Sequence, residues 1–282
     1  MKPFPIALVG PGSHDVEETA DYLPMPHEMA VFRPPLIVAA PAAAALEAHA
    51  ALAELLAAMR GHAFGSGAAP GLDLTALSPA GLAVVNQAMG QGEVSAVVRG
   101  ARNWRIEETS FAGIWHVLGQ REDGGIAADR LEVAPVPQVL RTTMAEAAQS
   151  RSPAVPPAPA GVMNSPALLA ELVDQSAAWH QGRPAHVINL TLLPVTPPDL
   201  DYLAQSLGCG PVTVLSRGYG NCRISSTRLP HTWWVQYFNS MDALILNTIE
   251  VIDVPAAALA APEDFADSTE RLAAWLETLL ED

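Results

Sequence analysis

Lysine is almost absent from this sequence, because Lys2 is the only one among 282 residues. Arginine does not make up the difference: 15 basic residues stand against 30 acidic ones, and the formal net charge is −15. A negative charge of this size disfavours contact with nucleic acid phosphates and with anionic membrane surfaces. We therefore expect no nucleic acid partner. A partner with a basic surface would fit the charge, although solubility alone also accounts for it.

Cysteine and long apolar runs are scarce as well. Cys209 and Cys222 are the only cysteines, which is too few for a disulfide framework and fits a reducing compartment. No uncharged, proline-free apolar run approaches the length of a membrane span, and Pro3, Pro5 and Pro11 interrupt the segment where a signal peptide has its apolar core. We expect a cytoplasmic protein that does not insert into a membrane.

Signatures of catalysis are also missing. The sequence has no G-x-S-x-G elbow, Walker loop, H-E-x-x-H or C-x-x-C motif. The Gly-Tyr-Gly run at 218–220 lacks the third glycine and the following helix of a dinucleotide site. Cys209, Cys222 and His231 do not have the spacing of a known metal site. We therefore expect no catalytic residue, no cofactor and no bound metal, and a protein that is not an enzyme.

The sequence does contain an internal repeat. A shift of 118 residues lays 90–137 over 208–255 without a gap, and Trp115 then meets Trp233. From Leu77 onward about eighteen of roughly sixty aligned positions are identical, where average composition predicts about four. This indicates a tandem duplication.

Each copy shows helical patterns around several short strand patterns. This predicts an α+β protein in which each copy is a mainly antiparallel sheet flanked by helices. The copies either pack face to face or hang as separate beads on the linker, and we expect packing, because each sheet must cover its apolar face. Composition divides the chain into an N-terminal arm (1–35), a first, degenerate repeat domain (36–150), a Pro/Ala-rich linker (151–162) and a second repeat domain (163–282).

The copies differ most in the loop that precedes Cys222. The first copy has Trp104 in place of Cys222 and has lost the glycine-rich loop. A hairpin turn next to a buried cysteine accounts for this difference, and so does a specialised contact loop. On the second interpretation, arginine and aromatic side chains supply binding energy. The candidate partner-binding residues are then Arg217, Tyr219, Asn221, Cys222, Trp233 and Trp234.

Two arginines and two glutamates recur in both copies although their neighbours differ. They are Arg105 and Glu132 in the first copy, and Arg223 and Glu250 in the second. We predict that each arginine forms a structural ion pair with the glutamate of its own copy.

Two long runs carry a resemblance to a known family: SRGYGNCRISSTRLP at 216–230 and WWVQYFNSMDALILNTIEVIDVP at 233–255. They resemble the C-terminal region of the HupH/HyaF family of hydrogenase expression/formation proteins. The run INLTLLPVTPPDLDYL at 188–203 fits as well, and the PMP and FRPP segments of the arm fit faintly. Within the family the likeness is strongest to HoxQ-type members, which accompany membrane-bound, oxygen-tolerant nickel–iron hydrogenases.

The resemblance implies an accessory protein that matures the hydrogenase small subunit, the subunit with iron–sulfur clusters and a twin-arginine signal. It also implies a thioredoxin-like hydrogenase accessory protein as a second partner. Two interpretations stay open. One is a chaperone that holds the small-subunit precursor before export, and the other is a thiol- or metal-dependent assembly factor that handles a cluster or metal through Cys222.

Overall fold

The computed structural model describes residues 40–148, 156–218 and 220–279. The predicted arm (1–35), the first part of the predicted linker and Tyr219 lie outside these ranges.

The two copies contain the same series of helices and strands. The first copy consists of α1 (Ala42–Arg60), β1 (Gly71–Asp73), α2 (Pro79–Met89), β2 (Val94–Val98), β3 (Asn103–Glu108), β4 (Ile114–Gln120), β5 (Ile126–Val133) and α3 (Gln138–Ala148). The second consists of α4 (Ser165–Ala177), β6 (His186–Asn189), η1 (Leu190–Leu192), α5 (Pro197–Leu207), β7 (Val212–Ser216), β8 (Asn221–Ser226), β9 (Thr232–Phe238), β10 (Leu244–Val251), η2 (Ala256–Ala258) and α6 (Pro262–Leu279). Helices α2 and α5, and strands β2–β5 and β7–β10, begin and end at residues 118 apart. The predicted α+β duplication is confirmed.

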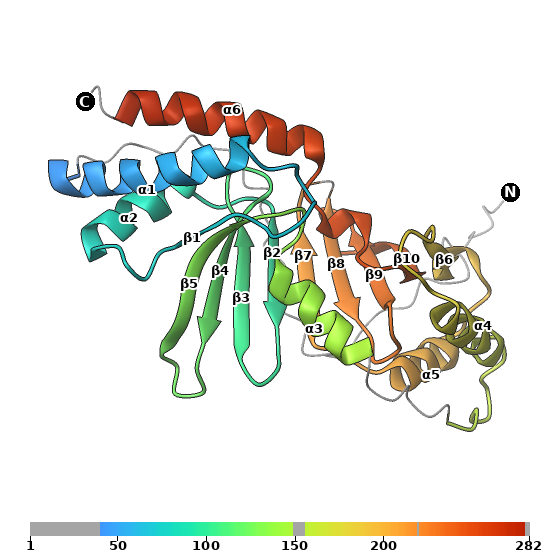
Figure 1. The fold of residues 1–282 in the computed structure, drawn as a ribbon. Helices are drawn as coiled ribbons and strands as arrows, with labels where there is room; N and C mark the ends of the chain where they lie inside the picture. Colours follow the sequence, from blue (N-terminus) through green and yellow to red (C-terminus); the bar gives the residue numbers. More distant parts are fainter. Residues whose placement is uncertain (1–39, 149–155, 219, 280–282) are drawn as a thin grey trace, which may run out of the picture.

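All strands join one antiparallel sheet in the order β1-β5-β4-β3-β2-β7-β8-β9-β10-β6 (Figure 1). At its centre Ala96 of β2 is opposite Val214 of β7, and these residues are equivalent in the two copies. A local two-fold axis therefore passes between them, perpendicular to the sheet. The copies do pack together, as expected, but they do so edge to edge and not face to face. The pairing of β2 with β7 covers a strand edge that each copy alone would expose.

The two faces of the sheet differ in what covers them. Paired residues point to the same face, and successive residues alternate between faces. One face, which we call the cysteine face, packs in its middle against α3 and η2. Its buried residues come from both copies: Ala96, Val98, Ile106, Trp115, Val117, Val212, Val214, Cys222, Ile224, Trp233 and Val235.

Helices cover only the two ends of the opposite face, which we call the arginine face (Figure 1). At one end α1, α2 and α6 pack on Leu131 of β5, and at the other α4 and α5 pack on Ile249 of β10. Neither of these two cores includes a residue of β2, β3, β7 or β8. Among the described residues, the middle of the arginine face is thus left without a helical cover.

Helix α6 follows the second copy in sequence but packs on the first. Its Leu272 and Leu276 join Leu52 and Leu55 of α1 in one core. Helix α1 is long and apolar enough to cross a membrane by length and composition alone, yet its apolar stripe belongs to this core. The two copies share hydrophobic cores. We therefore propose 163–282 as the second repeat unit, and not as a domain with a hydrophobic core entirely of its own.

Side chains cap the two matched helices. Ser78 accepts a hydrogen bond from the backbone of Gly81 at the start of α2, and Thr196 makes a capping box with Asp199 at the start of α5. Ser165 is the first residue of α4 and does not cap it. Its buried hydroxyl donates to Asp199 instead.

Asp199 ties the start of α4 to the start of α5. Its fully buried carboxylate accepts hydrogen bonds through Oδ1 from the backbone nitrogens of Met163, Asn164 and Ser165 at 2.9, 3.0 and 3.1 Å. Oδ2 accepts from the backbone nitrogen and the hydroxyl of Thr196 at 3.0 and 2.8 Å. Burial opposes ionisation, but the hydrogen bonds from Ser165 and Thr196 outweigh it and hold the pKa of Asp199 well below its usual range. In the first copy the matching carboxylate comes from another helix, where Glu47 of α1 accepts from Ser78.

Replacing this carboxylate should weaken the second copy. Asp199→Asn loses acceptor capacity toward buried donors, so the free energy of unfolding at pH 7 should fall by about 2 kcal/mol. The folded pKa lies below the unfolded value of about 3.9, so the contribution is present above that value and is lost as the pH falls through the folded pKa. The difference between wild type and variant in urea unfolding should therefore begin to shrink below about pH 4 and decrease further as the pH falls. The exposed Asp201→Asn is the control, and a difference that does not change with pH would contradict this role.

Candidate functional site

The predicted contact residues do not form one patch. Cys222 and Trp233 lie on the cysteine face with exposed fractions of 1% and 0%, so Trp233 is a core residue and its prediction as a contact is wrong. Arg217, Asn221 and Trp234 are half-buried and belong to the opposite, arginine face. Tyr219, the remaining candidate, lies outside the described residues.

The thiol of Cys222 lies among buried groups in β8. Its cross-strand partner is Tyr237 of β9, and the two side chains are hydrogen-bonded. Burial raises the pKa of Cys222 to about 12, opposed by the Tyr237 hydrogen bond and increased by the charge of Glu250. Burial also raises the pKa of Tyr237 to about 12. Arg217 and Arg223 flank Cys222 in sequence but point to the other face, so the thiol stays protonated at neutral pH, which opposes chemistry through a thiolate.

Thiol labelling tests this assignment. Cys209 is exposed and Cys222 is buried, so at pH 7.5 a disulfide reagent should label only Cys209 in the native protein. Urea should make the second thiol react. The Cys209→Ser variant isolates Cys222, and complete labelling of that native variant within minutes would contradict the protonated, buried state.

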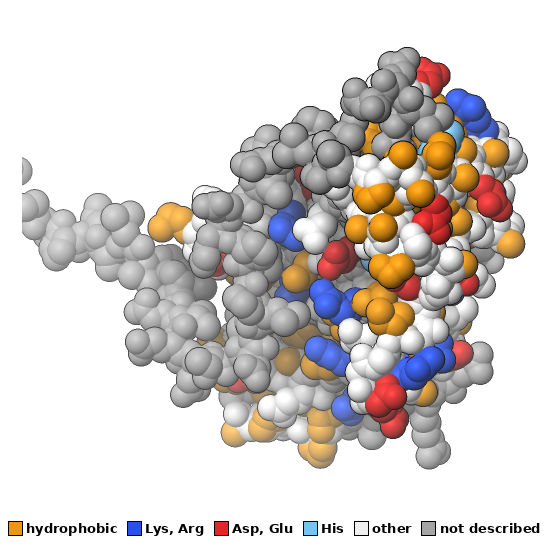
Figure 2. Space-filling view, turned by 90° about the vertical axis from the view of Figure 1, so that its left-hand side faces the viewer, with side chains coloured by type: hydrophobic (Ala, Val, Ile, Leu, Met, Phe, Trp, Pro, Cys, Tyr) orange, Lys and Arg blue, Asp and Glu red, His pale blue; other side chains and the backbone are white. Residues whose placement is uncertain are grey.

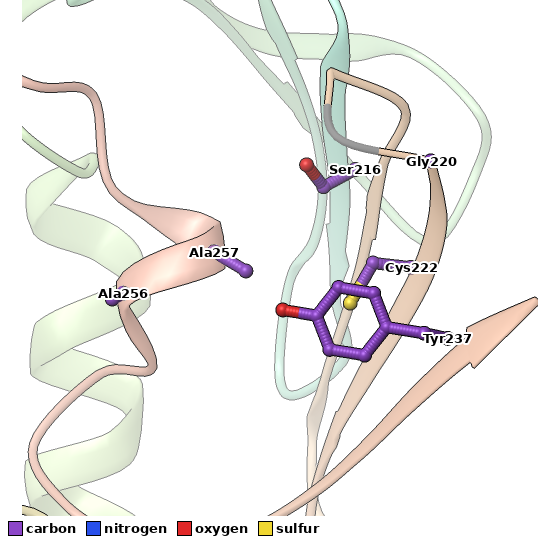
Figure 3. Close-up of a pocket in the computed structure, with 6 residues that line it drawn as sticks. All are labelled: Ser216, Gly220, Cys222, Tyr237, Ala256 and Ala257. Atoms are coloured by element: carbon purple, nitrogen blue, oxygen red, sulfur yellow. The ribbon is translucent and has the colours of Figure 1, made fainter. Parts of the chain in front are cut away.

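A cavity of about 300 Å³ lies beside this thiol. It separates strands β7, β8 and β9 from η2, and Figure 3 shows the Cys222 sulfur and the Tyr237 ring pointing across it toward Ala257. The lining residues are Ser216, Gly220, Cys222, Tyr237, Ala256 and Ala257. Among the described residues, no charged side chain lines it, so the cavity suits an uncharged group.

The middle of the arginine face is the second candidate. Arg105 of β3 is opposite Val97 of β2, which is in turn opposite a residue of β7. In the same way, Arg223 of β8 is opposite Leu215 of β7, which is opposite a residue of β2. These pairings place both arginines on one face, related by the local two-fold axis. The Arg105 side chain is 61% exposed and lies 3.5 Å from Glu107.

A second arginine pair continues the same symmetry. The backbone nitrogen of Arg99 donates to Pro211, and that of Arg217 donates to Glu93. Each arginine directly follows the last residue of its strand, Val98 of β2 or Ser216 of β7, and strand alternation continued by one residue places both side chains on the arginine face. Between the arginines the sheet has a shallow hollow of about 140 Å³, lined by residues of β2, β3 and β7.

Figure 2 views the molecule from the end of the sheet that carries β5. Lys2 lies outside the described residues, so every blue side chain there is an arginine. Several lie in the middle and lower part of this view with acidic side chains among them, and others lie at its upper right. A local cluster of arginines on a chain of net charge −15 favours contact with a partner that offers carboxylates or carbonyl oxygens.

The predicted structural ion pairs are wrong. Arg105 of β3 is paired with Leu118 of β4, which is paired with Asp129 of β5. Glu132 is three residues further along β5, so the side chains of Arg105 and Glu132 point to opposite faces of the sheet. Glu132 instead binds Arg130 at 3.0 Å. The register in the second copy separates Arg223 and Glu250 in the same way.

The metal-ligand candidates do not come together. Among the described residues, no three His, Cys, Asp or Glu side chains form a group that would hold a metal ion. His231 stacks on Trp179, with ring centroids 3.5 Å apart.

Sequence reasoning missed Tyr237 and the small residues around the cavity. The repeat held the signal, because Tyr237 aligns with Gly119 just as Cys222 aligns with Trp104. Paired changes of this kind indicate that two neighbouring side chains share one space.

Comparison with known proteins gives the family. The family described as "HupH hydrogenase expression protein, C-terminal conserved region" matches residues 44–154 and 162–279, which are the two copies. The chain is 45% identical over 271 residues to the hydrogenase expression/formation protein HoxQ of Cupriavidus necator, which covers 96% of this chain and 95% of that protein. It is 43% identical to HupH of Rhodobacter capsulatus over the same shares. It is 31% identical to the hydrogenase-1 operon protein HyaF of Escherichia coli, over 70% of this chain and 69% of that protein. The chain therefore belongs to the HupH family of hydrogenase expression proteins.

Proposed function

We propose that this protein is an accessory maturation factor for the iron–sulfur small subunit of a membrane-bound nickel–iron hydrogenase. It binds the small-subunit precursor in the cytoplasm before export, acts as a chaperone and catalyses no reaction. A thioredoxin-like hydrogenase accessory protein is its second partner. Membership of a family of hydrogenase expression proteins supports the pathway, and the two matched cores support a scaffold role.

One observation carries the binding proposal: the middle of the arginine face lacks a helical cover among the described residues. Four arginines surround it in two symmetric pairs, at Arg99, Arg217, Arg105 and Arg223. Arginine side chains are frequent among residues that dominate binding energy. We place the precursor on this face, with Asn221 and Trp234 at its margin.

The alternative role, direct handling of a cluster or metal by Cys222, has less support. The thiol is buried, its pKa is raised to about 12, and metal ligation or nucleophilic attack needs a thiolate.

Co-purification tests the proposed function. Affinity-tagged protein from cells that express the hydrogenase should carry the small-subunit precursor with its signal segment, and should lose it once the signal has been removed by export. An export-blocked strain should therefore increase the yield of the complex. Recovery of the large subunit alone, or of no hydrogenase subunit from an export-blocked strain, would overturn the proposal.

A further inference from the structure

The cavity beside Cys222 is a feature of the second copy, and the first copy shows how it arises. Trp104 and Gly119 occupy the positions of Cys222 and Tyr237. In the first copy the indole ring of Trp104 lies over Gly119, where an added Cβ would be 2.8 Å from the ring. The aromatic ring therefore comes from Trp104 of β3 in the first copy. In the second copy it comes from Tyr237 of β9, which is equivalent to β4 and not to β3. This exchange keeps one ring in the space and does not by itself open a cavity.

The opening comes from the other lining positions. Ser216, Gly220, Ala256 and Ala257 align with Val98, Arg102, Gln138 and Val139, in that order. Every one of the four is smaller in the second copy. A void forfeits contacts for the atoms that line it, so an occupant of matching shape gains contacts with a wall that is already formed.

The lining defines what fits. The volume of about 300 Å³ is at the small end of the range of about 300–1,000 Å³ for ligand sites, enough for a single large side chain. None of the described lining residues is charged, and a charged occupant would be left unpaired at high cost. The Tyr237 ring and the Cys222 sulfur offer favourable contacts to an aromatic ring. The hydroxyl groups of Ser216 and Tyr237 provide acceptors for an N–H donor.

We propose that this cavity binds one uncharged aromatic group, presented as a side chain by a protein partner on the cysteine face. Gly220 is exposed at the rim and has no side chain of its own, which favours the approach of a partner backbone at this position. The site lies on the face opposite the arginines and goes beyond the proposed capture of the precursor. It gives the second copy a contact that the first copy lacks.

Titration of the purified full-length chain with two probes tests this site. Indole represents the ring alone, and N-acetyl-tryptophanamide represents the ring on a peptide backbone. Both should bind wild type in ligand-observed NMR. Ser216→Val and Ala257→Val install the first copy's residues and should each weaken binding about tenfold or more, because added methyl groups occupy the space. Ser225→Val is the matched control, since it makes the same change in β8 on the opposite face and should leave affinity unchanged.

Other outcomes would contradict either the binding site or its proposed occupant. No binding of either probe to wild type removes the site, as does unchanged affinity in the filled variants. Binding of indole without N-acetyl-tryptophanamide assigns the cavity to a free small aromatic molecule and not to a protein side chain. Binding that appears only in Tyr219→Ala assigns it to the chain's own tyrosine. Melting temperatures show whether each variant folds, and Ala257→Val lies on η2, so it remains informative if Ser216→Val does not fold.

Discussion

Trp233→Ala should be among the most destabilising single substitutions in this protein, lowering the free energy of unfolding by about 4 kcal/mol. Trp233 is fully buried in the core that both copies share. Its indole N–H points to the backbone carbonyls of Ile252 and Asp253 at 3.2 and 3.1 Å. The variant would leave both a cavity and unpaired carbonyl groups. Urea unfolding followed by circular dichroism measures the loss.

The repeat supplies the matched variants. Trp115 is 1% exposed and donates to Ala134, the residue equivalent to Ile252, so Trp115→Ala should cost a similar amount. Trp234 is half-buried, and Trp234→Ala should cost less than half as much. A loss below about 1 kcal/mol for Trp233→Ala, together with lost precursor binding, would return Trp233 to the role of a contact residue.

Charge reversal on the arginine face should produce the largest effect on binding. The double variant Arg105→Glu with Arg223→Glu should weaken precursor binding about a thousandfold, because each arginine supplies about 2 kcal/mol. Arg105→Glu alone should weaken binding about thirtyfold, because this side chain is 61% exposed and its removal leaves the core intact. Isothermal titration with purified precursor measures both.

Arg60→Glu with Arg121→Glu is the control, because it makes the same change in net charge at exposed sites outside strands β2, β3, β7 and β8, which form the middle of this face. If the control weakens binding as much as the double variant, the effect is one of overall charge. If Arg105→Glu binds like wild type, the arginine face is not the contact surface.

The duplication was predictable because both copies keep the residues that fix the backbone. Gly90 and Gly208 have positive φ angles of 58° and 60° at the ends of matched helices, a conformation that favours glycine. The joining of the copies was not predictable, because apolar runs such as VSAVV and VTVLS do not specify which strand they pair with. The sequence of α6 likewise does not specify that it packs against α1.

Register also explains the errors at the candidate site. Arg105 and Glu132 lie on strands separated by β4, and one residue of register decides whether their side chains share a face. Arginines flank Cys222 in sequence, but alternation along the strand places their side chains on the other face. Burial then sets the pKa of the thiol.

A photo-cross-linking residue at Thr213 tests the central claim most directly. Thr213 lies in the hollow between the arginines on β7, whereas Gln205 is exposed on α5 and serves as the comparison. If the precursor binds the arginine face, cells that express the hydrogenase and are blocked in export should give a cross-link from position 213 to the small-subunit precursor and none from position 205. A cross-link from position 205 without one from position 213 would contradict capture on the arginine face.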